Sequence, residues 1–492
     1  MSDRPRFRDS GAIVLVRGHG DALEVYWAKR GDQVGFMPGF HAFVGGVTGP
    51  GDATLPMDGR TDDRGRALRA CAIRETFEEI GVLVARDGNR DPEVLDDARE
   101  RLLCGDATFG RLAAELGWRF HADDLAEAGR WRTPPFASAR FDAQYYLVRW
   151  PGGPEPVIAD AELAEGEWIA PARALERWRA GDALFAAPVL VTLRELSVGG
   201  DDVAARLVAA AERLPQPHRI EIAWGIVLQP MPTRALPPAT HTNAYLVGDG
   251  EMALVDPGSG DPAELDALAA LVDALAADGR RLTRILLTHA HADHTGGVEA
   301  MRARYGVPVS GHAAIADTVR LDDTLADGDT IALAPGADGR DWTLRAIHTP
   351  GHARGHLCYF HERTGALLSG DHVVGAGTVV IDPPEGDMTD YVASLEKLLA
   401  LPVRSIFPAH GSPAGAAQRR IRALIAHRRE RRERVLGALA AAPRTTAELL
   451  PLAYPDVRPE LWRWAERSLL AHLVELERQG HAARAGEGWR RA

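Results

Sequence analysis

The chain has 492 residues, of which 46% are hydrophobic and 26% charged, so its composition is that of folded globular domains and excludes a mainly disordered chain. Its formal net charge is −12, which opposes broad binding to nucleic acid or to an anionic membrane. Three cysteines are too few for a disulfide framework, and no apolar run approaches the roughly 18 residues of a membrane-spanning helix. We therefore expect a cytoplasmic protein with no membrane partner.

A first domain is predicted over residues 1–198. Apolar runs at 11–16, 23–27 and 143–150 are typical of strands, and the segment 66–80 has the pattern of a helix. Strands mixed with helix in this way indicate an α/β or α+β layer fold.

Three carboxylates share one face of the predicted helix. Glu75, Glu78 and Glu79 lie at positions i, i+3 and i+4, and like charges on one face repel unless a hard cation neutralises them. The pattern favours Mg²⁺ or Mn²⁺, which would bridge a pyrophosphate and position water for attack. We expect Arg74 to orient the three carboxylates. The alternative is a solvated acidic face with no cation.

The run RETFEEIGV at 74–82 resembles the second half of the Nudix box. FMPGFHAFVGG and RFDAQYYLV resemble the flanking segments of interrupted-box coenzyme A diphosphatases. The resemblance implies a Nudix α/β/α sandwich that hydrolyses a diphosphate linkage, with Glu78 and Glu79 as catalytic carboxylates and coenzyme A or its thioesters as the substrate. It also implies that Gly81 closes the box and that Glu162 is a further acidic residue near the metal.

The beginning of the box is interrupted. Gly46, which matches the glycine of the box, lies 28 positions before Arg74, about twice the usual spacing. An insertion is therefore expected to loop out between Gly46 and the helix.

A glycine-rich and proline-rich stretch at 199–218 predicts a linker that contains a short helix. A second domain is predicted over 219–418, because strand-like runs at 243–247 and 252–256 and a helical run at 262–277 start a new pattern.

Seven metal-type side chains follow strand-like runs of this second domain. Four lie within six positions of one loop, and three lie in separate glycine-rich loops. They are His289, His291, Asp293, His294, His352, Asp371 and His410. Imidazoles and carboxylates suit borderline divalent metals, and seven of them are enough for two ions. Two such ions would share and activate one hydroxide.

The set resembles the ligand set of the metallo-β-lactamase fold superfamily, whose fold is an αββα sandwich. The resemblance implies one site of His289, His291 and His352, a second of Asp293, His294 and His410, and a bridging Asp371. It implies a metal-bridging hydroxide that attacks an ester, thioester or phosphodiester, with Asp293 also catalytic. It gives Asp256 a supporting position that orients the ligand histidines. The two ions would be zinc, with iron and manganese as alternatives.

Residues 419–492 are predicted to form a third, helical domain. The run THTNAYLVG, the segment 369–398 and this tail resemble the lactamase-like protein 2 group, which implies a C-terminal winged helix. The best-known members of that group cleave single-stranded RNA. Eight arginines crowd positions 419–434, and either a solvated helix face or a phosphate-contacting edge would explain them.

Two substrate classes stay open at this point. The first is a small phosphoanhydride, ester or thioester, which the net charge and the Nudix resemblance favour. The alternative is an endoribonuclease whose Nudix domain senses a nucleotide without catalysing a reaction. Association of the chain with copies of itself also stays open.

Overall fold

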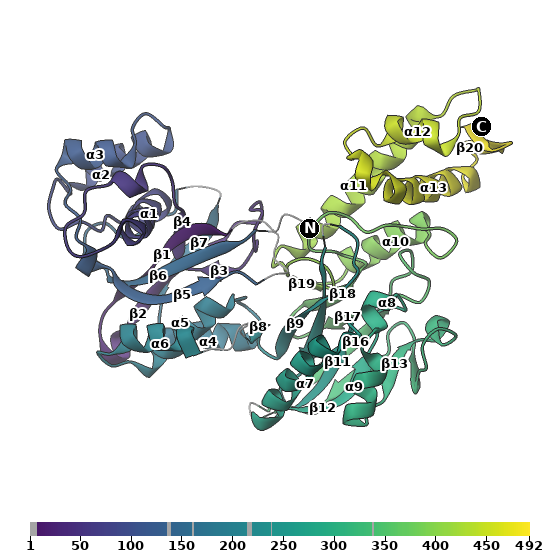
Figure 1. The fold of residues 1–492 in the computed structure, drawn as a ribbon, viewed down its shortest axis with the longest axis horizontal. Helices are drawn as coiled ribbons and strands as arrows, with labels where there is room; N and C mark the ends of the chain where they lie inside the picture. The colour runs from purple at the N-terminus through teal and green to yellow at the C-terminus, as the bar shows by residue number, and fades with distance from the viewer. Residues whose placement is uncertain (1–6, 135–138, 160–161, 214–218, 238, 337–338) are drawn as a thin grey trace. The chain divides into compact units, whose positions relative to one another are not determined.

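A computed structural model describes residues 7–134, 139–159, 162–213, 219–237, 239–336 and 339–492. The chain divides into two compact units, Met1–Trp224 and Gly225–Ala492. Each unit is described by itself (Figure 1). Of the helices in the described ranges, none is both long and apolar enough to cross a membrane.

The first unit is built on a sheet with the strand order β3-β2-β1-β6-β5, with β4 beside β1 and β7 beside β2. Its strands are β1 (Arg8–Arg17), β2 (Glu24–Arg30), β3 (His41–Ala42), β4 (Val44–Val47), β5 (Ala126–Arg132), β6 (Phe141–Arg149) and β7 (Leu163–Ile169), and β8 (Ile220–Ala223) follows. Its helices are α1 (Asp63–Ile80), α2 (Pro92–Leu103), α3 (Phe109–Leu116), α4 (Pro171–Ala180), α5 (Ala187–Val198) and α6 (Val203–Arg213). Strands β1 and β6 pair in parallel at the centre.

Helices cover both faces of this sheet. Alternate side chains of a strand point to opposite faces, and β1 places Ile13 against the core of α1 to α3 and Val14 against the core of α4 to α6. Figure 1 shows these two helical layers on either side of the strands. The arrangement is the predicted α/β/α sandwich.

The predicted linker contains helix α6. Leu207 of α6 belongs to the same core as Val14 and Leu193, so the helix packs on the first unit. Residues 214–218 of that linker lie outside the described residues.

The second unit contains two sheets. The first has the order β14-β13-β12-β11-β10-β9 and the second has the order β15-β16-β17-β18-β19. The strands of the first are β9 (Ile226–Pro232), β10 (His241–Val247), β11 (Glu251–Val255), β12 (Arg281–Leu286), β13 (Val309–His312) and β14 (Asp323–Leu325). Those of the second are β15 (Thr330–Leu333), β16 (Trp342–His348), β17 (Leu357–His361), β18 (Ala366–Gly370) and β19 (Ser405–Pro408).

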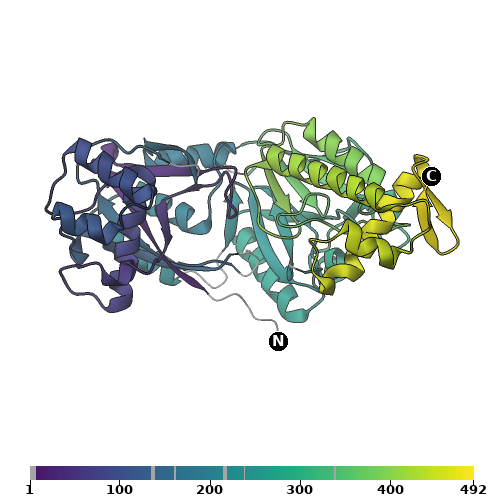
Figure 2. The ribbon, with the colours of Figure 1, turned by 90° about the horizontal axis from the view of Figure 1, so that it is seen from above.

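Helices lie on the outer face of each sheet. The core of the first sheet includes α7 (Pro262–Ala277) and α9 (Val298–Tyr305), and that of the second includes α10 (Met388–Leu399) and α11 (Ala417–Ala438). Figure 2 shows α10 and α11 as neighbouring helices. The inner faces of the two sheets meet, since the Tyr359 hydroxyl donates to the Leu287 carbonyl at 2.7 Å. This is the predicted αββα sandwich.

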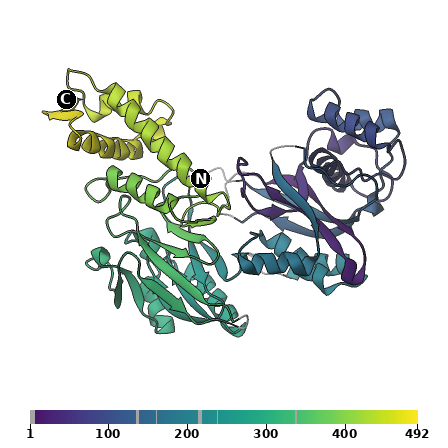
Figure 3. The ribbon, with the colours of Figure 1, turned by 180° about the vertical axis from the view of Figure 1, so that it is seen from behind.

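Helix α11 continues from the sandwich into a small C-terminal domain (Figure 3). Ile421 and Leu424 belong to the sandwich core, whereas Val435 and Ala438 belong to the C-terminal core. The other elements of that domain are α12 (Thr446–Ala453), α13 (Trp462–Arg478), β20 (Ala482–Ala485) and β21 (Gly488–Arg491). The hairpin β20-β21 forms the wing of the predicted winged helix.

Candidate metal centre

The seven predicted ligands all lie at or just beyond strand ends, in short loops and one short helix. His289 and His291 follow β12, and Asp293 and His294 lie in α8 (Ala292–Thr295). His352, Asp371 and His410 follow β16, β18 and β19 respectively. Loops at the ends of packed sheets can therefore bring ligands from distant parts of the sequence together.

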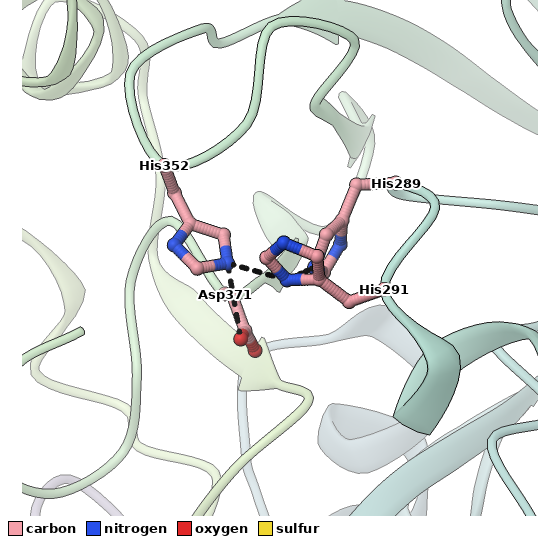
Figure 4. A group of neighbouring side chains, drawn as sticks. All are labelled: His289, His291, His352 and Asp371. Carbon is pink, nitrogen blue, oxygen red and sulfur yellow. Dashed lines mark hydrogen bonds and ion pairs between the residues drawn. The ribbon is translucent and has the colours of Figure 1, made fainter. Parts of the chain in front are cut away.

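Four of the seven form the first group. One ligand atom from each of His289, His291, His352 and Asp371 lies within 4.8 Å of the others (Figure 4). His291 Nδ1 is 2.9 Å from His289 Nε2 and 3.1 Å from His352 Nε2. Nitrogens bound to one tetrahedral zinc ion at about 2.0–2.1 Å would be about 3.3 Å apart, so this group is close to the spacing that a metal requires.

The other three form a second group, and Asp371 lies between the groups. Asp293, His294 and His410 each offer a ligand atom within 4.8 Å of the others. Asp371 Oδ1 is 3.5 Å from His294 Nε2 and 3.3 Å from His410 Nε2, while Asp371 Oδ2 is 3.5 Å from His352 Nε2. The two carboxylate oxygens thus face different groups, as a bridging ligand requires.

Asp256 orients two of the histidines from the side that faces away from the centre. Asp256 Oδ2 accepts from His294 Nδ1 at 2.9 Å and from the Thr288 hydroxyl at 2.6 Å, and that hydroxyl lies 3.0 Å from His289 Nδ1. Because the Thr288 proton points to Asp256, we assign the proton of His289 to Nδ1, where it donates to Thr288. Both imidazoles then direct an Nε2 lone pair into the centre.

Backbone carbonyls fix two more histidines in the same way. His352 Nδ1 donates to the Val380 carbonyl and His410 Nδ1 donates to the His241 carbonyl, both at 2.9 Å. Their Nε2 atoms are therefore also left as lone pairs that face the centre.

The electrostatics of the centre favour a bound cation. Burial lowers the pKa of His352 to about 4, so this imidazole stays neutral and able to bind a metal. Although burial opposes the change, His410 and His294 hold the pKa of Asp371 well below its usual range, and Asp371 in turn raises the pKa of His410 to about 10. Positive charge is thus stabilised beside an ionised carboxylate.

Two buried atoms of the centre have no hydrogen-bond partner among the described residues. They are His294 Nε2 and Asp371 Oδ1. Buried polar atoms are rarely left unsatisfied, and a nitrogen lone pair beside a carboxylate oxygen is a donor set for a divalent ion. The residues present therefore fit the metals that the sequence implied.

The acidic face of α1 in the first unit is organised by Arg74. Its Nη1 contacts Glu75 Oε1 and Glu78 Oε2, both at 2.8 Å. Its Nε and Nη2 donate to the two oxygens of Asp52 at 2.9 and 3.0 Å. Asp52 is buried in the insertion that interrupts the box. No periodicity or spacing in that insertion marks Asp52 as a functional residue.

Glu79 is buried and Glu75 is partly buried, and both lie against β4. Burial, followed by nearby carboxylates, raises the pKa of Glu79 to about 8, and burial likewise raises that of Glu75 to about 7. The Gly45 amide donates to Glu79 at 3.1 Å. A Cβ on Gly46 would lie 2.2 Å from the Glu75 carboxyl carbon, so only glycine leaves room for that carboxylate.

The remaining predicted residues of this region lie around the acidic face. Gly81 ends α1 in the left-handed conformation, with φ of 72°. Glu162 is exposed, and its charge raises the pKa of Glu79 slightly after the larger effects of burial and Glu75. Within the described ranges, the glutamates of α1 do not form a set of three ligand atoms that all lie within 4.8 Å of one another, as the central residues do.

Three parts of the chain each match a known protein family. The model described as the metallo-beta-lactamase superfamily matches residues 237–410, the NUDT19 Nudix domain matches 55–196, and the beta-lactamase associated winged helix domain matches 445–489. The beta-lactamase-like protein 2 homolog of Drosophila melanogaster is 30% identical over 249 residues, which cover 49% of this chain and 83% of that protein.

The chain belongs to the metallo-β-lactamase superfamily.

Two other relatives of this metallo-β-lactamase superfamily member cover different parts of it. The atrochrysone carboxyl ACP thioesterase dmxR1 of Cryptosporiopsis sp. (strain 8999) is 34% identical over 200 residues, or 40% of this chain and 58% of that protein. A Nudix hydrolase structure from Alicyclobacillus acidocaldarius is 30% identical, with a TM-score of 0.36, and the match covers 41% of this chain and 97% of that one. The protein is a metal-dependent hydrolase with Nudix, metallo-β-lactamase and winged-helix domains.

Further residues of the metallo-β-lactamase domain support the centre. His356 is buried, and its Nε2 accepts from the Asp371 amide at 3.2 Å. Asn243 donates to the carbonyls of Pro408 and Gly411 at 2.9 and 2.8 Å, which fixes the loop of His410. Asn243 lies in a run that predicted only a strand, so its role had no sequence signal beyond the family resemblance.

Proposed function

We propose that the metal centre hydrolyses a thioester carried on a phosphopantetheine arm, as in acyl-coenzyme A. We further propose that the Nudix domain hydrolyses a diphosphate linkage in the same class of molecule. The central site would hold two divalent ions, zinc first among them, and the Nudix site would hold Mg²⁺ or Mn²⁺.

One observation carries the hydrolytic part of the proposal. Four imidazoles direct Nε2 lone pairs, each set by a partner at Nδ1, toward the two oxygens of Asp371. Ions bound there would polarise a carbonyl and lower the pKa of water. Asp293, whose side chain is 23% exposed, is the carboxylate that we assign to orient the attacking water.

The substrate class is supported by one relative of the metal domain and by the family match of the Nudix domain. The dmxR1 relative is named a thioesterase, and the Nudix match lies in the same chain as the metal centre. If the Nudix domain divides acyl-coenzyme A at its diphosphate, the products are an acyl-phosphopantetheine and an adenosine bisphosphate. The first of these still contains the thioester that the metal centre would hydrolyse to a carboxylic acid and a thiol.

The RNA alternative depends on free arginines along α11. Four arginines of α11 are not free, because each has a carboxylate partner within 4.0 Å. The pairs are Arg429 with Glu396, Arg431 with Asp456, Arg432 with Glu433 and Arg434 with Glu430. Arg428 and Arg431 are also buried, at 3% and 4% exposure. These pairs support the small-molecule proposal, because partnered arginines neutralise fewer phosphates of a polyanion.

The experiment separates the two sites with one variant in each. The full chain, loaded with zinc and Mg²⁺, is given short acyl-coenzyme A esters, and the products are followed by mass spectrometry. Glu78→Gln should abolish diphosphate cleavage and keep thiol release, whereas Asp371→Asn should do the reverse. His312→Gln, which changes a histidine outside the seven ligands, is the control and should keep both.

Two outcomes would contradict the proposal. One is unchanged thiol release by the Asp371→Asn protein. The other is a protein that cleaves a single-stranded RNA oligonucleotide but releases no thiol from any acyl ester. If the Asp371→Asn protein loses that cleavage, the RNA alternative is favoured.

A further inference from the structure

A cavity of about 350 Å³ lies where α10, α11 and α13 meet in the second unit. Its volume is at the lower end of the range for small-molecule sites. The lining residues are Met388, Val392, Arg428, Arg429, Arg432, Glu433, His472 and Glu475. None of them belongs to the metal centre, and three of them are arginines.

Arg428 brings a buried charge to this cavity. It is 3% exposed, its Nη2 donates to the Val379 carbonyl, and its guanidinium lies 5.0 Å from the Tyr391 ring centre. Its Nε has no hydrogen-bond partner, and no carboxylate in the described part of the chain lies within 4.0 Å of it. Buried arginines are normally paired with an anion.

The two lining carboxylates already have partners. Glu433 pairs with Arg432 at 2.6 Å, and Glu475 Oε2 lies 3.2 Å from His472 Nδ1. Since His472 donates from Nδ1, its buried Nε2 is a lone pair, and this atom also has no hydrogen-bond partner among the described residues. The cavity wall thus combines an uncompensated guanidinium with an unpaired acceptor.

We propose that this cavity binds a phosphate group. A phosphate oxygen accepts a hydrogen bond from the unpaired Nε of Arg428. Arg429 and Arg432 pair with Glu396 and Glu433, and each guanidinium has further N–H groups that can donate to the other phosphate oxygens. The monoanion of a phosphate monoester has one hydroxyl, and that of inorganic phosphate has two; one hydroxyl donates to the unpaired nitrogen of His472. The small volume fits a phosphate with a short attached chain and excludes a folded polynucleotide.

The site is joined to the metal centre through two consecutive residues. Arg428 binds the carbonyl of Val379, and the carbonyl of the next residue, Val380, accepts from the metal-ligating His352. A phosphate that fixes Arg428 therefore also fixes the segment that orients His352.

The test is a titration of the full-length, metal-loaded protein with inorganic phosphate, followed by calorimetry at constant ionic strength with chloride as the other anion. We expect saturable binding that becomes at least tenfold weaker in Arg432→Gln and in Arg428→Gln. Since Arg428 is buried and its variant can fail to fold, the partly exposed Arg432 keeps the test decisive. Phosphate that binds at the metal centre should bind equally in every variant, so it does not account for a difference in affinity between them.

The matched control is Arg434→Gln, which removes a charge two residues along α11 and outside the cavity lining. It should bind phosphate as the unaltered protein does. Equal affinities of Arg432→Gln and Arg434→Gln, or no saturable binding in the unaltered protein, would overturn the proposal.

A second arm identifies the source of the phosphate. Hydrolysis of an acyl-phosphopantetheine is compared with that of the matching acyl-pantetheine, which lacks the phosphate. A KM raised in Arg432→Gln for the phosphorylated ester alone identifies the phosphate of the substrate, whereas an unchanged KM with weakened calorimetric binding identifies free phosphate. Only this second experiment rests on the proposed thioesterase activity. If that activity is absent, the calorimetric titration still tests the phosphate site.

Discussion

At the scale of single residues, Asp256 is a buried support of the metal centre. It is 1% exposed, and its carboxylate accepts from the Thr288 amide, the Thr288 hydroxyl and His294. Its own backbone has φ of 50°, a conformation that non-glycine residues rarely adopt and that Asp tolerates better than most. This strain is maintained because three donors hold the carboxylate in place.

Asp256→Asn should weaken the metal centre without unfolding the sandwich. An amide has only one acceptor oxygen, so it cannot accept from the Thr288 amide on one side and from His294 and the Thr288 hydroxyl on the other. Turned either way, the side chain loses part of this set, and the ligand histidines lose their fixed orientation. We expect zinc affinity to fall about 10–100-fold, measured by competition with a chromophoric chelator. Asp266→Asn, at an exposed position on α7, should leave the affinity unchanged. Equal affinity in the two variants would show that Asp256 does not orient the ligands.

His41 makes the stability of the first unit depend on pH. It packs 4.3 Å from the Trp27 ring, and burial, followed by the charges of Arg177 and Lys29, lowers its pKa to about 3. Between pH 6.5 and about 3 the unfolded chain binds a proton that the folded unit does not. Stability therefore falls as the pH falls through this window, by up to about 1.4 kcal/mol per pH unit.

His41→Phe should remove this contribution. Thermal unfolding of the first unit, followed at pH 7 and pH 5, should show a smaller acid-induced loss in the variant than in the unaltered chain. His19→Phe changes an exposed histidine and should keep the full loss. If both variants lose the same stability on acidification, His41 is not the group responsible.

At the scale of elements, β4 needs two adjacent glycines, Gly45 where it pairs with β1 and Gly46 where it faces α1. A Cβ on Gly45 would lie 2.4 Å from the backbone oxygen of Gly11 and 2.6 Å from the Ala12 Cα, so strands would have to separate. The three atoms nearest to a Cβ on Gly46 would all belong to the carboxylate of Glu75. The first glycine therefore serves the fold, and the second serves the acidic site.

Gly46→Ala should accordingly keep the fold and damage the site. The Glu75 carboxylate must move away, which separates it from Glu78 and Arg74. The central site is first loaded with zinc, so that added Mn²⁺ reports on the first unit. We expect the Mn²⁺ affinity of the first unit to fall at least tenfold, as measured by electron paramagnetic resonance of free Mn²⁺. Gly49→Ala, where a Cβ would have its nearest neighbour at 3.7 Å, should bind Mn²⁺ normally. Normal Mn²⁺ binding by both variants would show that Glu75 is not part of the cation site.

At the scale of the whole molecule, the winged helix supports the loop beside the metal ligands. Arg467 of α13 donates to Asp382 at 2.6 Å, Arg478 pairs with Asp387, and the Ser468 hydroxyl accepts from the Ile381 amide at 3.3 Å. These contacts hold a segment that begins one residue after Val380, the partner of His352.

The double variant Arg467→Gln and Arg478→Gln should loosen that segment. Two surface pairs contribute about 0.5 kcal/mol each, so amide exchange of residues 381–387 should quicken about fivefold, as measured by hydrogen–deuterium exchange. Arg463→Gln, which alters an exposed arginine of the same helix, is the control. Unchanged exchange in the double variant would show that the tail does not stabilise the loop.

The sequence predicted the features that depend on residue type and local spacing. The seven ligands could be found because histidine and aspartate followed apolar strands in glycine-rich loops, and the helix of Glu75 because its carboxylates share a face. Asp52 could not be found, since an insertion of irregular conformation places it against Arg74. The arginines of α11 were expected either on a solvated face or along a phosphate-contacting edge, but burial of Arg428 depends on the packing of three helices that no local pattern encodes.

Helix α11 has a consequence for how the protein can be divided. Because one uninterrupted helix supplies side chains to two hydrophobic cores, the tail cannot swing on a hinge as a tethered module would. A protease should find no accessible bond within Ala417–Ala438 while both cores are intact. Recombination between relatives would have to exchange the sandwich and its tail together, whereas the Nudix half, with its own separate core, could be gained or lost as a piece.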